Sequence, residues 1–420
     1  MSRPFRSAAL AVALFAGARA AQAQTLPVDD PVLRAIWAQG MDSSRATDLA
    51  QALMDSIGPR LNASPAHLAA NNWAVARLRS WGIDARNEQY GTWRSWRRGI
   101  THLDLLTPRV RTLEATMLAW SPGTRGKVQG KVVILPDAAD SVALARWAAT
   151  NKDAFVLTSF PQPTCRPDSS FREFARPATW DRMVAERTAG RDAWTARLNR
   201  MGGTAVVQRE LDRAGVKGIL TNNWSQGWGV DKVFSAGTFK SPLEKTPVLD
   251  VSCEDYGLLF RLAQRDQGPT VRLEAEAEDL GEQPVYNTIG MIRGSTLPDE
   301  YVVLSAHYDS WDAGSGATDN GTGSTVMLEA MRILRAAYPH PKRTIMIGLW
   351  GGEEQGLNGS RAYAADHPEV VNGLQALFNQ DNGTGRIENI SASGLVGPES
   401  AWGNWLARLP AELTRDLKIN

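Results

Sequence analysis

Residues 301–323 read YVVLSAHYDSWDAGSGATDNGTG, residues 343–356 read RTIMIGLWGGEEQG, and residues 374–383 read LQALFNQDNG. Each segment opens with an apolar run of buried-strand length, and each run ends where acidic side chains begin. Helical spacing of apolar residues over 322–338 separates the first run from the second. The pattern predicts an α/β fold with a mostly parallel mixed sheet, helices on both faces, and ligands beyond the carboxyl ends of the strands.

The polar side chains at these strand ends are of types that bind metal. They are His307, Asp319, Glu353, Glu354 and Asp381. Two neighbouring divalent ions need a bridging carboxylate, imidazole nitrogen and further carboxylates, with positions left open for water. Taken singly, such residues at strand ends usually form turns and helix caps. Their occurrence together predicts a two-metal site.

The same segments resemble a known family. The runs 307–323, 350–356 and 380–383 are similar to those of the co-catalytic di-zinc exopeptidases, which include secreted bacterial aminopeptidases and glutamate carboxypeptidase. The wording is closest to the plasma glutamate carboxypeptidase-like members. By this resemblance His307 and Asp381 would bind one zinc ion, Asp319 would bridge two ions, and Glu354 would bind the second.

The resemblance also implies two catalytic roles. Glu353 would be the general base that activates a water held by the metal. Asp309 would orient the ring of His307, because a metal-bound imidazole needs a hydrogen-bond acceptor on its other nitrogen.

One expected ligand of the family has no counterpart here. The family pattern completes the Glu354 zinc with a second histidine downstream of the position of Asp381. The histidines of this chain are His67, His102, His307, His340 and His367, so none follows Asp381. We therefore expect a chain that is incomplete at its C-terminus. Of the family's two zinc sites, this chain would fully ligate one. Whether the 420-residue form is active does not follow from the sequence.

The N-terminal residues have the features of a secretory signal peptide. Arg3 and Arg6 precede an apolar run over 8–18, and Ala21-Gln22-Ala23 offers a cleavage site, so residues 1–23 are expected to be removed. The run is too short to span a membrane. An uncleaved anchor is the alternative. The expected localisation is the periplasm or the extracellular space, with Gln24 as the first residue of the mature chain.

The composition is that of a globular protein. Hydrophobic residues make up 43%, and Lys+Arg 46 nearly balance Asp+Glu 45. A near-neutral chain gives no support for nucleic acid or an anionic membrane as partner. A peptide substrate is what the family resemblance implies. Cys165 and Cys253 could form one disulfide in an oxidising compartment or remain two buried thiols.

The chain is expected to divide into a catalytic domain and an insertion. Residues 24–120 and 251–420 would form the catalytic domain in two parts, the second incomplete at its C-terminus. In the first part, apolar spacing predicts helices over 46–57 and 66–81. Residues 121–250 resemble the β-rich protease-associated domain often inserted in this family, which commonly forms a lid or wall over the catalytic cleft.

The predicted function is hydrolysis of terminal peptide bonds by a zinc-dependent aminopeptidase or dipeptidase. A glutamate carboxypeptidase-type specificity is the alternative among enzymes, and it would need a basic pocket for the substrate carboxylate. Single-zinc glutaminyl cyclase is disfavoured because Asp319, Glu353 and Glu354 are all present. A non-catalytic, receptor-like member is the alternative outside enzymes, because the last histidine ligand is absent.

Overall fold

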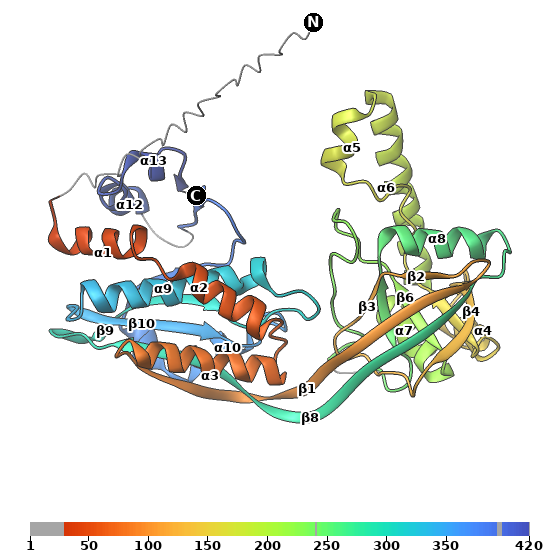
Figure 1. Ribbon diagram of the computed structural model, residues 1–420, viewed down its shortest axis with the longest axis horizontal. Helices are drawn as coiled ribbons and strands as arrows, with labels where there is room; N and C mark the ends of the chain where they lie inside the picture. The colour runs from red at the N-terminus through yellow and green to blue at the C-terminus, as the bar shows by residue number, and fades with distance from the viewer. Residues whose placement is uncertain (1–28, 240–241, 393–396, 420) are drawn as a thin grey trace, which may run out of the picture. The chain divides into compact units, whose positions relative to one another are not determined.

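The computed structural model describes residues 29–239, 242–392 and 397–419 (Figure 1). The predicted signal peptide, residues 1–23, and Gln24 lie outside these residues. The chain divides into two units, one of residues 1–42 with 385–420 and one of residues 43–384. In the described part of the chain, no helix combines the length and the apolar character that crossing a membrane requires.

The smaller unit contains short elements. Its helices are α1 (Pro31–Met41), α12 (Pro398–Leu406) and α13 (Ala411–Thr414). Strands β12 (Asn389–Ile390) and β13 (Lys418–Ile419) form a parallel pair. Helix α1 begins after Asp30, whose carboxylate accepts hydrogen bonds from two first-turn amides, as an N-cap aspartate does.

Three parallel strands of the larger unit confirm the strands predicted from the apolar runs. They are β9 (Leu297–His307), β10 (Arg343–Trp350) and β11 (Leu374–Asn379). Strand β9 lies between the other two and pairs with both in parallel. Because β10 is buried along nearly its whole length, it reads as an uninterrupted apolar run rather than an alternating one.

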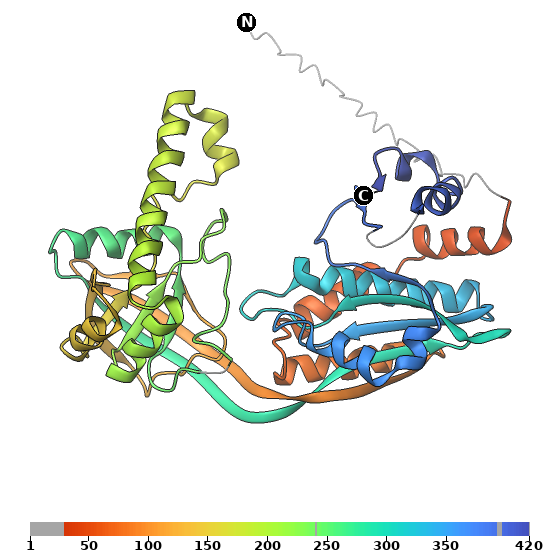
Figure 2. The ribbon, with the colours of Figure 1, turned by 180° about the vertical axis from the view of Figure 1, so that it is seen from behind.

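Helices cover both faces of these strands, as predicted. Helices α3 (Pro65–Ser80) and α9 (Thr322–Ala337) lie on the face seen in Figure 1, with α2 (Ala46–Gln51) and a π-helical turn over 52–57. Figure 2 shows α10 (Asn358–Asp366) on the opposite face, followed in the chain by α11 (Pro368–Asn372). The core between these first helices and the sheet contains the buried residues Leu53, Leu78, Leu328 and Met331. The predicted apolar spacings therefore do face a core.

A long antiparallel ribbon forms the middle of the sheet. Strands β1 (Asp84–Thr107) and β8 (Thr270–Ile292) pair along nearly their whole lengths, and Figure 1 shows them side by side. Strand β8 also pairs antiparallel with β10 near one end and with β4 (Val128–Ile134) near the other. The sheet is mixed as predicted, but parallel pairing is confined to β9–β11 and β4–β7 and does not predominate.

The segment predicted as a β-rich insertion contains more helix than strand. Strands β4, β5 (Ala154–Leu157), β6 (Gly218–Thr221) and β7 (Val248–Val251) run parallel. They belong to one eleven-stranded sheet of the described residues with β8–β11, β1, β2 (Arg111–Leu113) and β3 (Ala115–Met117). The helices are α4 (Ser141–Ala149), α5 (Asp168–Phe174), α6 (Pro177–Arg200) and α7 (Thr204–Ala214), and α8 (Cys253–Gln264) follows β7. The domain boundaries remain predictions.

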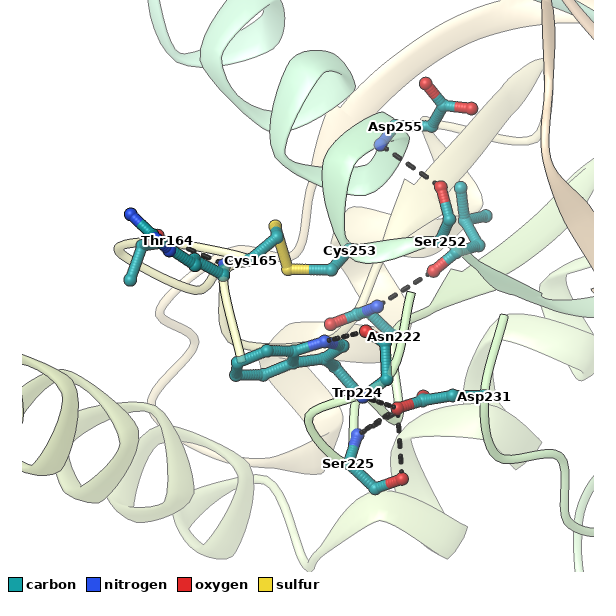
Figure 3. Close-up of a disulfide and its surroundings, with 12 residues drawn as sticks. Thr164, Cys165, Asn222, Trp224, Ser225, Asp231, Ser252, Cys253 and Asp255 are labelled. Atoms are coloured by element: carbon teal, nitrogen blue, oxygen red, sulfur yellow. Dashed lines mark hydrogen bonds between the residues drawn. A yellow bond between two sulfur atoms is a disulfide. The ribbon is translucent and has the colours of Figure 1, made fainter. Parts of the chain in front are cut away.

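The two cysteines form a disulfide bond (Figure 3). Cys165 precedes α5 and Cys253 is the first residue of α8, and their Cα atoms are 5.6 Å apart. Beside the bond, the Asn222 side-chain amide donates to the main-chain carbonyl of Val251. The bond therefore links the segment before α5 to the start of α8, next to the loop that starts at Asn222.

Candidate metal centre

The three parallel strands end at one edge of the sheet. In the register, His307 of β9 pairs with Trp350 of β10, and Ser305 pairs with Asn379 of β11. Consequently His307, the turn 351–356 after β10 and the loop 380–383 after β11 emerge side by side. The parallel register thus places the acidic side chains that follow the strands at one edge, where open α/β sheets bind ligands.

Three of the predicted ligands are in contact. His307 is 3% exposed, and its Nε2 lies 2.9 Å from an Asp319 carboxylate oxygen and 3.2 Å from one of Asp381. Their possible ligand atoms all lie within 4.8 Å of one another. The structure therefore brings together an imidazole and two carboxylates from three different chain segments.

The electrostatics of this cluster call for a positive charge. Burial lowers the pKa of His307, but the carboxylates of Asp309, Asp319 and Asp381 outweigh it and raise that pKa to about 12. The pKa of Asp319 is lowered, chiefly by its hydrogen bond to His307. A cation held between these carboxylates would take the place of the imidazolium charge and leave Nε2 free to bind it.

Asp309 contacts both the His307 ring and the turn that carries Glu353 and Glu354. Its side chain is 0% exposed, and its two carboxylate oxygens accept the main-chain N–H groups of Glu353 (3.0 Å) and Glu354 (3.3 Å). Its main-chain carbonyl lies 3.0 Å from Nδ1 of His307, whereas the nearer carboxylate oxygen is 3.7 Å away. Because a carbonyl can only accept, Nδ1 donates and Nε2 is left to face Asp319 and Asp381. The main chain of Asp309 thus contacts the ring, and its carboxylate holds the Glu353–Glu354 turn.

Glu353 and Glu354 are both half-buried on this turn. Burial, together with the neighbouring carboxylates of Asp319 and Asp309, raises the pKa of Glu354 to about 8. Burial, with Asp309 and Asp381, also raises the pKa of Glu353. Oε1 of Glu354 is buried and has no hydrogen-bond partner among the described residues. A buried carboxylate oxygen without a donor is costly unless it binds a cation.

The donor set fits zinc. One imidazole nitrogen and two carboxylates make a three-ligand set that leaves a coordination position open, as catalytic zinc sites do. Asp319 and Glu354 also line one pocket of about 270 Å³, so the unpaired oxygen of Glu354 could serve a second ion that shares Asp319. Imidazole favours zinc over magnesium or calcium at the His307 position.

Arg60 is a site residue whose role the sequence did not reveal. Its side chain is 0% exposed and donates to four main-chain carbonyls, those of Gly58, Tyr308, Ser315 and Gly316, at 2.8–3.0 Å. These bonds tie the loop after His307 to the segment before α3. Nothing in the local sequence distinguishes this buried arginine from an exposed one.

Asn320 is a second site residue whose role the sequence did not reveal. Its side-chain amide donates to the carbonyl of Gln380 (2.7 Å), and its oxygen accepts the N–H of Gly323 (3.1 Å). It therefore joins the Asp319 loop to the residue before Asp381 and satisfies an amide in the first turn of α9. The Asp-Asn-Gly wording contains no signal that separates this role from that of an ordinary turn.

The pocket beside the centre has an aromatic wall. Residues 230–234, from the loop between β6 and β7, line it with Trp311, Asp312, Asp319 and Glu354. The rings of Phe234 and Trp311 meet edge to face with their centroids 5.4 Å apart. Lys232 is its one basic lining residue among those described, and its Nζ lies 5.0 Å from the centroid of the Phe234 ring.

Comparison with known proteins gives the family. A model described as peptidase family M28 matches residues 287–415, which include every residue from His307 to Asp381 discussed above. Residues 287–415 of this chain therefore match peptidase family M28. The resemblance to the di-zinc exopeptidases is confirmed at this level, close to glutamate carboxypeptidase-like members.

The curated relatives that this chain matches are longer than it is. Carboxypeptidase Q from Mus musculus is 25% identical over 346 residues, which cover 82% of this chain and 66% of that protein. Probable glutamate carboxypeptidase VP8 from Zea mays is 25% identical over 373 residues, covering 81% of this chain and 50% of that protein. The chain thus spans two thirds or less of the length of these relatives.

Solved structures support the fold. A peptidase M28 precursor from Shewanella amazonensis aligns with a TM-score of 0.62 at 24% identity, covering 92% of this chain and 81% of that one. An aminopeptidase from Aneurinibacillus sp. strain AM-1 aligns with a TM-score of 0.51 at 16% identity, covering 91% and 81%. The mixed sheet flanked by helices is therefore a fold that these two solved structures share.

Proposed function

We propose that this chain is an exported zinc-dependent exopeptidase that acts as an aminopeptidase or dipeptidase. The observation that carries the proposal is the contact of His307 with Asp319 and Asp381, directly beside the Glu353–Glu354 turn. The match of residues 287–415 to peptidase family M28 supports it, as does the similarity to carboxypeptidase Q and to a probable glutamate carboxypeptidase. The disulfide supports export, because such bonds persist in oxidising compartments.

His307, Asp319 and Asp381 would hold one zinc ion, and Glu354 with the shared Asp319 would hold a second. Bound zinc would polarise the scissile carbonyl and stabilise the negative charge that develops on its oxygen. The first position has three ligands from this chain and the second has two, so we expect the first to bind zinc more tightly.

Glu353 is the residue that moves the proton. Its carboxylate takes a proton from the attacking water as the water oxygen bonds to the peptide carbon. When the peptide C–N bond breaks, Glu353 returns the proton to the leaving amine, so atoms and charge balance. Asp309 positions this carboxylate through the two main-chain N–H groups of the turn.

Metal-dependent cleavage at a free chain end tests the proposal. The purified chain supplied with zinc is expected to release the terminal residue from aminoacyl chromogenic substrates and dipeptides. It should not cleave peptides blocked at both ends, and a chelator should stop turnover until zinc is restored. Cleavage of blocked peptides, or activity that survives chelation, would contradict an exopeptidase of this kind. Binding of peptides without turnover in the zinc-loaded chain would favour the receptor-like alternative.

One observation favours recognition of a substrate carboxylate as well. Lys232 is the basic residue of the pocket that Asp319 and Glu354 also line. It lies close enough to Asp319 to lower the pKa of that residue, although the hydrogen bond from His307 contributes more. A free carboxylate two or three bonds from the scissile amide of a short peptide would meet this ammonium group. Dipeptides are therefore the preferred substrates under this proposal.

Replacing Lys232 with methionine is expected to raise KM about 10-fold or more for a dipeptide with a free carboxylate. A charge-assisted hydrogen bond contributes about 1.5–3 kcal/mol, and 1.4 kcal/mol is tenfold in affinity. The KM for the same dipeptide amidated at its C-terminus should change little. Lys152→Met, at an exposed position, is the control. Equal losses for the free and amidated dipeptides would refute carboxylate recognition by Lys232.

A further inference from the structure

Three polar side chains lie against the glycines that precede Glu353. A β-carbon at position 351 would lie 3.0 Å from both the Tyr90 hydroxyl and Cε1 of His67. A β-carbon at position 352 would lie 2.7 Å from the same hydroxyl and 3.0 Å from Nδ2 of Asn62. Only glycine permits such close contact, and Gly352 also has a φ of 65°. We call Asn62, His67 and Tyr90 the polar support.

Filling space in the core does not explain why the residues of the polar support are polar. Asn62 is 0% and His67 is 1% exposed, yet Nδ2 of Asn62 and Nε2 of His67 have no hydrogen-bond partner among the described residues. The bond that joins the group is that from the Tyr90 hydroxyl to Oδ1 of Asn62, at 3.0 Å. Buried polar atoms without partners destabilise a fold, so apolar side chains would serve better if filling space were their purpose.

The support completes the restraints on the turn. The N–H of Gly351 donates to Oδ1 of Asn287 (3.0 Å), and the carbonyl of Gly352 accepts the N–H of Asn358 (3.0 Å). Asp309 holds the next two N–H groups, those of Glu353 and Glu354. With main-chain hydrogen bonds on one side and Tyr90, Asn62 and His67 on the other, the two glycines have little room to move. The directions of the two glutamates that follow are set by where the glycines lie.

We propose that Asn62, His67 and Tyr90 are positioning residues that aim the carboxylates of Glu353 and Glu354 through Gly351 and Gly352. The inference rests on the proposed function only for its effect on turnover, since the placement of the turn is a property of the fold. A misplacement of a catalytic group by about 1 Å can cost 10²-fold in rate. The contact with the Tyr90 hydroxyl is shared by both glycines, so Tyr90 is the residue to change first.

Tyr90→Phe removes that hydroxyl and little else. We expect kcat to fall about 10- to 100-fold with KM nearly unchanged, because the turn shifts while the substrate pocket stays intact. Amide hydrogen exchange of a peptide covering residues 351–357 should become faster, because the bonds to Asp309 open more often. Tyr338→Phe is the matched control, since its half-buried hydroxyl accepts the N–H of Lys342 outside the metal centre. Neither kcat nor exchange over 351–357 should change in the control.

A second variant tests the contact in the opposite direction. Gly352→Ala introduces the β-carbon that would clash with the Tyr90 hydroxyl, so part of its loss of kcat should be recovered in Gly352→Ala/Tyr90→Phe. Unchanged exchange and unchanged kcat in Tyr90→Phe, or strictly multiplicative losses in the double variant, would overturn the inference. A fully active Glu353→Gln would instead overturn the proposed function, and the exchange experiment would still decide the role of Tyr90.

Discussion

Glu353→Gln is expected to lower kcat by about 10²- to 10⁴-fold while the protein keeps its zinc. General acid–base catalysis by a positioned side chain contributes a factor of this size, and glutamine can neither take nor return a proton. The substitution preserves the size of the side chain and the main-chain N–H that donates to Asp309. Zinc content after dialysis should be unchanged, because the proposed ligands are other residues. Steady-state kinetics paired with metal analysis measures both effects.

Two further glutamates provide the comparison. Glu354→Gln is expected to lose metal as well as activity, since its buried oxygen is the atom proposed to bind the second ion. Glu369→Gln, whose carboxylate is exposed and pairs with His367, should behave like the unmodified protein. If Glu353→Gln turned over substrate at the normal rate, or lost zinc as Glu354→Gln should, the assignment of Glu353 as base would be wrong.

Strand β10 could be predicted from sequence because it is buried along nearly its whole length and is therefore almost continuously apolar. Strand β11 lies at the edge of the sheet and is mostly exposed, so the Asp381 that follows its short apolar run was the clearer signal of its end. Helix α9 ends one residue before its predicted end. Local composition was sufficient for these elements.

The antiparallel ribbon could not be predicted as one piece. Strand β8 is continuous from Thr270 to Ile292, although its middle carries no sequence signal for a strand. Residues 278–284 are half-buried or exposed, so they carry no apolar alternation, and Gly281 there has a positive φ. Pairing with β1 determines this conformation, and such pairing joins residues about 180 positions apart, a tertiary effect that overrides local propensity.

The site residues also divide into those that the sequence predicts and those that it does not. Residues that would bind metal or carry a proton have chemically distinctive side chains, and the sequence predicts His307, Asp319 and Asp381 as ligands for that reason. The sequence does not reveal Arg60 and Asn320, because their side chains donate to main-chain carbonyls of distant segments. Every residue has a main-chain carbonyl, so the type of the accepting residue does not indicate that such a hydrogen bond forms.

Arg60→Met is expected to lower the free energy of unfolding by about 3–5 kcal/mol, because a buried carbonyl that loses its donor costs about 1–3 kcal/mol. The guanidinium donates to four carbonyls, three of them in the loop 308–316 that follows His307. Relaxation of that loop would recover part of the loss, so the four costs should not simply add. The loop also contains Asp309, so the variant should retain less zinc than the unmodified chain.

Urea unfolding of Arg60→Met against Arg79→Met measures the effect. Arg79 is exposed and donates one hydrogen bond, from Nε to the carbonyl of Ala85, so its replacement should cost no more than about 1 kcal/mol. Arg60→Lys separates charge from geometry, because an ammonium group keeps the charge but cannot reach carbonyls on both sides as a planar guanidinium does. We expect Arg60→Lys to be nearly as destabilised as Arg60→Met. Equal unfolding midpoints for Arg60→Met and Arg79→Met would mean that the loop after His307 is held by its other contacts, and that the four bonds of Arg60 contribute little to the metal centre.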